Sequence, residues 1–175
     1  MKTENIENYL NSFGKQVVNR AKGGLQKSKG GGTNLEKSIS FKVTKGTDGF
    51  SVQFFMADYG SFVDKGVSGT KEKRSYKDYK NKTVSSPYKY TSKQPPPSIL
   101  AKWISKKSIK GRDKKSGRFI SNMSLAFIMG RAIKRDGIQG ISFFQKPLML
   151  GLKQFGKQLL GAVKDDIIKG LTTVK

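Results

Sequence analysis

Lysine and arginine are concentrated in one part of this sequence and give it the chemistry of an anion-binding surface. Residues 69–118 contain sixteen Lys or Arg and three acids, a net charge of +13 out of +23 for the 175-residue chain. Charge at that density repels itself, so it is retained where an anionic partner or neighbour offsets it. The feature therefore predicts a class of partner rather than a reaction.

Tyrosines among these basic residues add a second kind of contact. Cationic side chains neutralise phosphates and tyrosine rings stack on unpaired bases, so the segment suits sequence-independent binding of nucleic acid. The alternatives are a solvated surface, or an arm that orders on an acidic neighbouring subunit, and charge does not separate them. The candidate contacts to nucleic acid or to a protein partner are Lys71, Lys73, Arg74, Tyr76, Lys77, Tyr79, Lys80 and Lys82.

Composition excludes several kinds of catalytic site. The sequence has no Cys and no His, which removes zinc sites built on those ligands, iron–sulfur clusters, thiol nucleophiles and disulfides. A metal-dependent nuclease needs converging carboxylates, and Asp58 and Asp64 are the pair kept for that hypothesis. Residues 151–157, GLKQFGK, match the start of a P-loop but lie inside a helical pattern with no preceding strand. We expect no enzyme activity, no cofactor and no bound metal.

Nothing in the sequence predicts a membrane segment. The longest apolar run, Leu125 to Met129, is far shorter than the ~20 residues that a bilayer-spanning helix needs. The N-terminal residues MKTENIENYL contain no apolar signal segment. We expect a soluble, unsecreted protein without a membrane partner.

Two helical patterns enclose the basic segment and must position it. Apolar residues spaced by three and four predict a helix from about Asn5 to about Gln26, ended by the glycines at 30–32. Pro147 begins a second pattern that continues almost to the C-terminus. The predicted buried stripes are Ile6, Leu10, Phe13, Val17, Ala21 and Leu25 in the first helix, and Leu148, Leu152, Phe155, Leu159, Val163, Ile167 and Leu171 in the last.

The segments between these helices read as a hairpin, loops and two further helices. Residues 39–44 and 50–56 alternate apolar and polar side chains around the turn KGTDG, which predicts an antiparallel hairpin. Residues 59–69 are predicted to be a loop, and the proline-rich residues 70–97 an extended excursion. Ser98 begins one short helix with Ile99, Leu100, Trp103 and Ile104 on a face. Ser121 or Asn122 begins another that ends at Gly137, with the stripe Leu125, Ile128, Met129, Ala132 and Ile133.

Three segments in a fixed order resemble the neck and tail-completion proteins of tailed bacteriophages. The segments are TNLEKSISFKV, YGSFVDKGVSGT and LAFIMGRAIKRDGIQGISFFQKPL. The matching residues are Thr33, Leu35, Ser38 and Ile39 in the first; Tyr59, Phe62, Val63, Asp64 and Gly66 in the second; and Ala126, Ile133, Gly137, Ile138, Phe143, Phe144 and Pro147 in the third. Asp64 stands where this family more often has Glu.

That resemblance implies an α+β protomer with a small antiparallel sheet packed against a long N-terminal, a middle and a C-terminal helix. It implies one domain over 1–175, with 70–97 as an extended basic insertion. It further implies a homo-oligomeric ring in the virion neck, assembled in the host cytoplasm, that contacts portal or tail proteins and the genomic DNA in passage. The alternative from the residues is a free, sequence-independent nucleic-acid-binding protein that uses the Lys/Tyr-rich loop.

Overall fold

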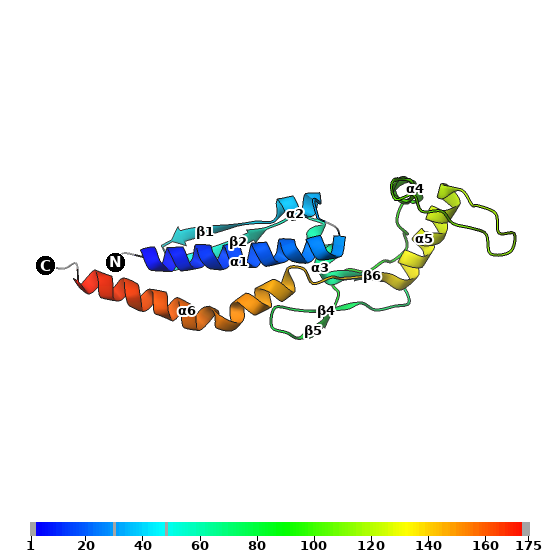
Figure 1. Cartoon of the computed structure of the whole chain (residues 1–175). Helices are drawn as coiled ribbons and strands as arrows, with labels where there is room; N and C mark the ends of the chain where they lie inside the picture. Colours follow the sequence, from blue (N-terminus) through cyan, green and yellow to red (C-terminus); the bar gives the residue numbers. More distant parts are fainter. Residues whose placement is uncertain (1–2, 30, 48, 173–175) are drawn as a thin grey trace. The chain divides into compact units, whose positions relative to one another are not determined.

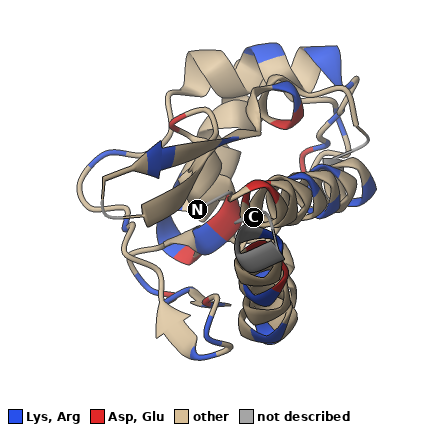
Figure 2. Ribbon diagram, turned by 90° about the vertical axis from the view of Figure 1, so that its left-hand side faces the viewer, with Lys and Arg blue, Asp and Glu red and all other residues tan. Residues whose placement is uncertain are grey.

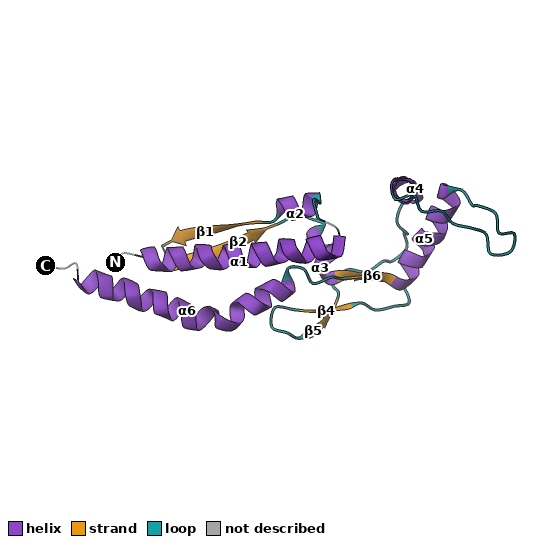
Figure 3. Ribbon diagram, viewed as in Figure 1, coloured by secondary structure: helices purple, strands orange, loops and turns teal. Residues whose placement is uncertain are grey.

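The computed structural model describes residues 3–29, 31–47 and 49–172, and it has the predicted α+β class (Figures 1 and 3). Its helices are α1 (Glu4–Lys29), α2 (Asn34–Ser38), α3 (Gly60–Lys65), α4 (Pro97–Lys106), α5 (Asn122–Asp136) and α6 (Gln145–Thr172). Its strands are β1 (Ser40–Gly46), β2 (Gly49–Phe55), β3 (Gly66–Ser68), β4 (Ser75–Lys77), β5 (Thr83–Ser85) and β6 (Gly137–Gln139). The strands form antiparallel β1–β2 and β3–β6 ladders and a separate β4–β5 pair.

The chain groups into two compact units, which are described separately. The first unit contains residues 1–64, 77–83 and 141–175, and the second contains residues 65–76 and 84–140. The single domain with an insertion at 70–97 stays a prediction.

The core of the first unit lies where α1 packs against α6 and the β1–β2 hairpin (Figure 1). The predicted α1 stripe is confirmed, because all six of its apolar residues are buried. Phe143 and Phe144, which precede α6, complete this core. The ring of Phe54 contacts those of Phe13 and Phe144 edge to face, with centroids 6.4 Å and 5.4 Å apart.

The predicted hairpin is confirmed, with Phe41 opposite Phe54 and Val43 opposite Val52. The alternating pattern places these four residues on one face, because successive side chains of a strand point to opposite sides. Their half-buried side chains face the helices, while the residues between them are exposed or only partly covered. Asp48 in the predicted turn, and Gly30 in the glycine joint, lie outside the described residues.

Helix α6 follows the predicted helical pattern but buries less of it. Leu148, Phe155, Leu159 and Val163 are half-buried, while Leu152 and Ile167 are exposed. The side chain of Leu171 lies outside the described part of the chain. The P-loop-like residues 151–157 lie within α6, as the helical pattern predicted.

Both long helices receive an aspartate at their N-termini from a distant part of the first unit. Asp166 on α6 accepts hydrogen bonds from the backbone amides of Asn5 and Ile6, at 3.1 and 3.0 Å. Asp64 at the end of α3 accepts one from the amide of Phe144, which directly precedes α6, at 2.8 Å. The first amides of a helix have no intrahelical acceptor, and the helix dipole favours a negative charge there.

The second unit combines the β3–β6 ladder with the packed pair α4 and α5. Gly137 ends α5 as predicted, with φ of 73° and its amide bonded to Ile133. A Cβ at this position would collide with the carbonyl oxygen of Val67 on β3. Gly66 also has a positive φ, 76°, with the backbone of residues 138–140 against it. These two glycines allow the strands to approach each other closely.

The middle of the chain differs from the sequence prediction in three places. Residues 59–69 are not a loop, because they contain α3 and β3. Residues 70–97 contain β4 and β5, and the backbone of Tyr88 and Tyr90 is hydrogen-bonded to Ser68 on β3. On α4 and α5, Ile104 is buried as expected, but Ile99, Trp103 and Ile128 are exposed; Ala126 and Gly130 are the buried residues of α5.

Candidate nucleic-acid and partner interface

The second unit concentrates positive charge. It has seventeen Lys or Arg and three acids in 69 residues, so its net charge is +14. Figure 2 shows basic residues recurring along helices and loops of the chain with few acids among them. Of those three acids, Asp136 is paired with Arg135, with 2.6 Å between Oδ1 and Nε. The unit therefore has a surplus of cations to offer an anionic partner.

The predicted contact residues divide among several environments. Lys71 and Lys73 line a pocket with Ser68, Gly69, Thr70, Ser85, Ser86 and Lys89. Arg74 has a structural contact instead, because its Nε donates to the carbonyl oxygen of Asp136 at 2.9 Å. Tyr76 is half-buried, with the Nζ of Lys65 5.8 Å from its ring centroid. Arg74 and Tyr76 are thus fixed within the second unit.

The other predicted contacts, Lys77, Tyr79, Lys80 and Lys82, lie in residues 77–83 of the first unit. Asp78 organises this tip, because its Oδ1 accepts hydrogen bonds from the amides of Lys80 and Lys82. The ring of Tyr79 is 43% exposed, with the Nζ of Lys80 5.5 Å from its centroid. This arrangement presents one accessible aromatic ring beside three exposed lysines.

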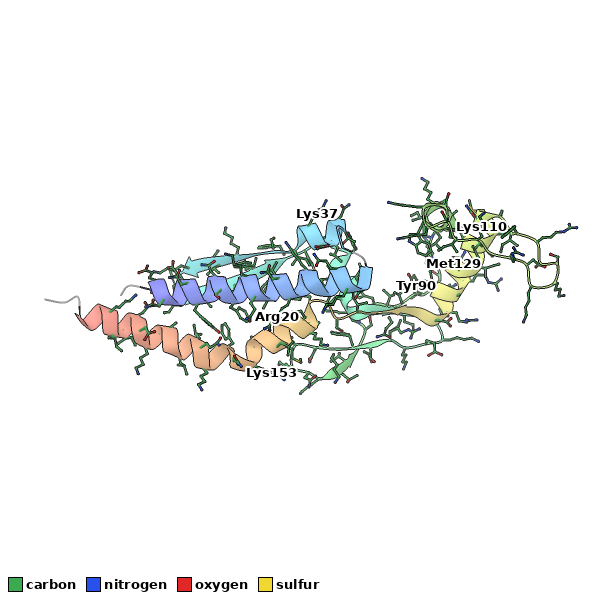
Figure 4. All side chains as sticks on the ribbon, in the orientation of Figure 1. Arg20, Lys37, Tyr90, Lys110, Met129 and Lys153 are labelled. Carbon is green, nitrogen blue, oxygen red and sulfur yellow. The ribbon has the colours of Figure 1, made fainter. Side chains whose placement is uncertain are left out.

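A basic hairpin occupies residues 109–120, between α4 and α5. The strands are bridged between Arg112 and Phe119, and the Asp113 carboxylate accepts bonds from the amides of Lys115 and Ser116. Hydrogen bonds from the amide and the hydroxyl of Ser116 lower the pKa of Asp113 below its ordinary value, and desolvation acts in the opposite direction. The bond from the Lys115 amide lowers the pKa further. The guanidinium carbon of Arg112 lies 4.4 Å from the Phe119 ring centroid. Figure 4 labels Lys110 at this hairpin.

Helices α4 and α5 expose large apolar side chains. The exposed fractions range from 44% for Trp103 to 64% for Ile99. Among the described apolar residues of the second unit, Ile104 and Ala126 are the buried ones. Large apolar side chains exposed on two packed helices make this pair a candidate protein interaction site, because contiguous uncovered apolar area commonly marks such sites. Its members are Ile99 and Trp103 on α4 and Met123, Phe127 and Ile128 on α5; we call them the α4–α5 apolar face.

An apolar groove crosses the first unit. It has a volume of about 580 Å³. It is lined from α1 by Ile6, Leu10 and Phe13, from β2 by Phe50, Val52 and Phe54, and from α6 by Leu148, Leu152, Phe155, Leu159 and Val163. The groove explains why the periodic stripe of α6 is only partly covered.

The residues of the family-motif loop are Tyr59, Phe62, Val63, Asp64 and Gly66, and they differ in burial. Tyr59 and Phe62 are exposed, Val63 is half-buried, and Asp64 and Gly66 are buried. Because Asp64 binds the amides that begin α6, it is not free to converge with Asp58 on a metal. The described residues contain no group of three or more His, Cys, Asp or Glu that could hold a metal ion.

Comparisons with known proteins give no relative: no family model, curated protein or solved structure matches this chain. In the described residues, no helix combines the length and the apolar character required to cross a membrane.

Sequence reasoning missed part of the pocket around Lys71 and Lys73. Lys89 was not singled out, although it belongs to the same basic segment. The structure brings it beside Ser68 through a parallel β-bridge between these two residues. Ser85 and Ser86 join the pocket from β5 and the residue after it. The charge of Lys89 was the available signal in the sequence. Its bridge to Ser68, which places it at the pocket, could not be predicted from that charge.

Proposed function

We propose that this chain is a structural virion protein of a tailed bacteriophage. It is a neck or tail-completion subunit that assembles into a ring, joins the portal of the head to the tail, and lines or seals the DNA conduit. Its place is the virion neck, with the host cytoplasm as the site of assembly, and it works without catalysis. Its partners are other copies of itself, portal or tail proteins, and genomic DNA in passage.

The observation that carries this proposal is that parts of all three segments behind the family resemblance lie together in the first unit. Ser38 of the first segment accepts a hydrogen bond through its Oγ from the amide of Ala57, at 3.0 Å, just before the second segment. The carbonyl oxygens of Val63 and Asp64 accept bonds from the amides of Ile141 and Ser142. The second and third segments are therefore hydrogen-bonded to each other, and the first bonds to a residue two positions before the second, an arrangement that is consistent with a fold built on these segments.

The α4–α5 apolar face supports assembly with a protein partner. Its five large apolar side chains are exposed, and covering them removes apolar area from water at about 25 cal/mol per Å². Pairing this face with the same face of another copy would bring two +14 units together, which charge repulsion opposes. A contact with a different surface fits better. Heterologous contacts of that kind are the ones that close rings with more than two subunits.

An amber mutation in the gene, tested in the phage that encodes it, measures this function. The proposal expects non-suppressing hosts to accumulate filled heads and separate tails, seen by electron microscopy, and expects plasmid-supplied protein to restore joined virions. Mass spectrometry of purified virions should detect the chain. Normal virions made without the protein would overturn the proposal.

A second candidate, a free nucleic-acid-binding protein, is favoured by the tip at residues 77–83, where Tyr79 is accessible beside Lys80 and Lys82. Stacking of a base on an aromatic ring contributes about 1–3 kcal/mol. This candidate predicts that Tyr79→Ala weakens binding of single-stranded DNA at least fivefold, while Tyr79→Phe preserves it. Equal affinity of the Ala variant and the parent protein would remove this mode of binding.

A further inference from the structure

A small pocket in the second unit has a strongly cationic lining. Its volume is about 270 Å³, and three separate stretches of chain contribute to it. Lys71 and Lys73 come from the segment after β3, while Lys89 is joined to Ser68 of β3 by a parallel β-bridge. None of the described lining residues is acidic. The full lining is Ser68, Gly69, Thr70, Lys71, Lys73, Ser85, Ser86 and Lys89.

Hydrogen bonds hold the backbone of this pocket in place. Ser68 donates its amide to Tyr88, accepts the amide of Tyr90 at its carbonyl oxygen, and accepts the amide of Arg74 at its Oγ, at distances between 2.8 and 3.0 Å. Ser86 bonds through its amide to the carbonyl oxygen of Arg74 and through its Oγ to that of Gly66. The segments that carry the three lysines are therefore fixed to one another before any ligand binds.

The pocket offers charge and hydroxyl donors to a compact anion. A lysine ammonium group is a point charge with three donors, and it is a common phosphate ligand. The exposed side chains of Thr70 and Ser85 add hydroxyl groups at the rim. None of the described lining residues is aromatic, so the pocket has no ring on which a base would stack. Its chemistry is suited to the backbone of a nucleic acid and not to its sequence.

We infer that Lys71, Lys73 and Lys89 form a phosphate-binding pocket for the backbone of duplex DNA. Three lysines that line one pocket repel each other, and a strand of phosphates offsets that repulsion while releasing counterions. Duplex DNA is favoured over a single strand because its phosphate charge is denser along the axis, and the pocket has no aromatic ring to stack on an unpaired base. The inference deepens the proposed function by assigning the surface that meets the genome, and it rests on that function for its biological setting.

Fluorescence anisotropy with a labelled 20-base-pair duplex, measured between 50 and 300 mM NaCl, tests the inference. The pocket variant is Lys71→Ala/Lys73→Ala/Lys89→Ala. The matched control, Lys102→Ala/Lys106→Ala/Lys107→Ala, removes the same charge from exposed positions at α4 and just after it. The pocket variant should bind at least tenfold more weakly at 100 mM salt. Its slope of log affinity against log salt should fall by about 2.7, since each phosphate contact contributes about 0.9.

The control variant should lose less than threefold in affinity, and all three proteins should show the same circular dichroism and urea midpoint. Equal losses in the two variants would show that a diffuse field binds DNA and would overturn the pocket. Polyglutamate that displaces the labelled duplex as well as unlabelled duplex does at the same total charge would also overturn the inference, because the pocket would then bind any polyanion and not phosphate in particular. Lys89→Ala alone, expected to lose about threefold, provides the test if the triple variant unfolds.

This experiment uses the purified chain with no portal or tail protein, so its failure is separable from failure of the proposed function. If joined virions require the protein but the pocket variant binds DNA normally, the pocket assignment falls and the structural role stands. If the pocket binds DNA but virions form without the protein, the structural role falls. The pocket variant should still restore joined virions in the amber mutant, since none of its three lysines belongs to the segments behind the family resemblance.

Discussion

The carboxylate of Asp64 accepts a hydrogen bond from the backbone amide of Phe144, 80 positions later, with 2.8 Å between Oδ1 and N. Gln145, the first residue of α6, has its amide 3.4 Å from the same oxygen. The first turn of α6 contains no acid of its own. Asp64 therefore provides the negative charge for that helix from another segment, and it joins the second motif to the third.

We predict that Asp64→Ala destabilises the first unit by about 1–3 kcal/mol, because a buried amide loses its acceptor. Asp64→Asn keeps an acceptor oxygen and should lose less, about 1 kcal/mol or below, from the missing charge at the helix N-terminus. Urea unfolding followed by circular dichroism measures both variants. Equal stability of the Ala variant and the parent would contradict the role of Asp64.

Asp166 makes the stability of the α1–α6 contact dependent on pH. Burial by itself would raise the pKa of Asp166. The pKa is nevertheless lowered, because the carboxylate accepts hydrogen bonds from the amides of Ile6 and Asn5 and from the Asn5 side chain, and because the positive charge of Lys169 favours the ionised form. A carboxyl with a lowered folded pKa stabilises the protein above its unfolded pKa, about 3.9, and loses that stabilisation as pH falls through the folded value.

The urea midpoint of the parent protein should therefore fall more steeply below about pH 4 than that of Asp166→Asn. The two curves should be furthest apart near pH 7 and converge at acidic pH. The comparison isolates Asp166 from Asp113 and Asp136, whose pKa values are also lowered but which both proteins retain. Parallel curves over the whole range would be inconsistent with the hydrogen bonds that Asp166 accepts.

Gly137 provides a test of the β3–β6 ladder. Its φ of 73° and ψ of −168° belong to a region that is nearly restricted to glycine, and a side chain there would meet the carbonyl oxygen of Val67. Gly137→Ala should destabilise the second unit by about 1–3 kcal/mol. Gly156→Ala, within α6, is the matched control. A Cβ added at Gly156 would meet no neighbouring side chain or segment, so this variant should stabilise the protein by about 0.5–1 kcal/mol. Hydrogen exchange of the β3 and β6 amides reports the local effect.

The sequence predicted the elements whose pattern is local. The α1 stripe was correct because all six of its residues are buried, four of them in the core cluster of the first unit. The stripe of α6 has the same period but lines an open groove, since periodicity identifies residues that share a face and not what covers that face. Helix α3, with six residues, is too short to display a period. The capping bonds of Asp64 and Asp166 join residues 80 and about 160 positions apart, and no local pattern encodes them.

The candidate site was predictable in composition and not in geometry. Charge identified Lys71 and Lys73, but the position of Lys89 depends on the bridge to Ser68. Arg74 was a reasonable candidate by charge, yet its guanidinium binds the carbonyl oxygen of Asp136. The exposure of Trp103 and Ile128 was also missed, because an apolar residue on a helix is ordinarily covered within its own chain.

The α4–α5 apolar face should bind hydrophobic dye in the isolated protein. Met123→Ser/Phe127→Ser removes two of its exposed side chains and should lower the fluorescence of bound ANS by about half. Because both side chains are exposed by about one half, stability should change by about 0.5 kcal/mol or less. Undiminished ANS binding by the variant would show that the dye binds elsewhere. The apolar groove of the first unit is the other site that could bind it.

Sedimentation velocity of the purified chain mixed with candidate portal and tail proteins tests the central claim most directly. The account predicts a discrete ring-sized complex that contains several copies of this chain, and predicts that Met123→Ser/Phe127→Ser reduces or abolishes it. A chain that stays monomeric at 19.4 kDa in the presence of both partners would contradict the account.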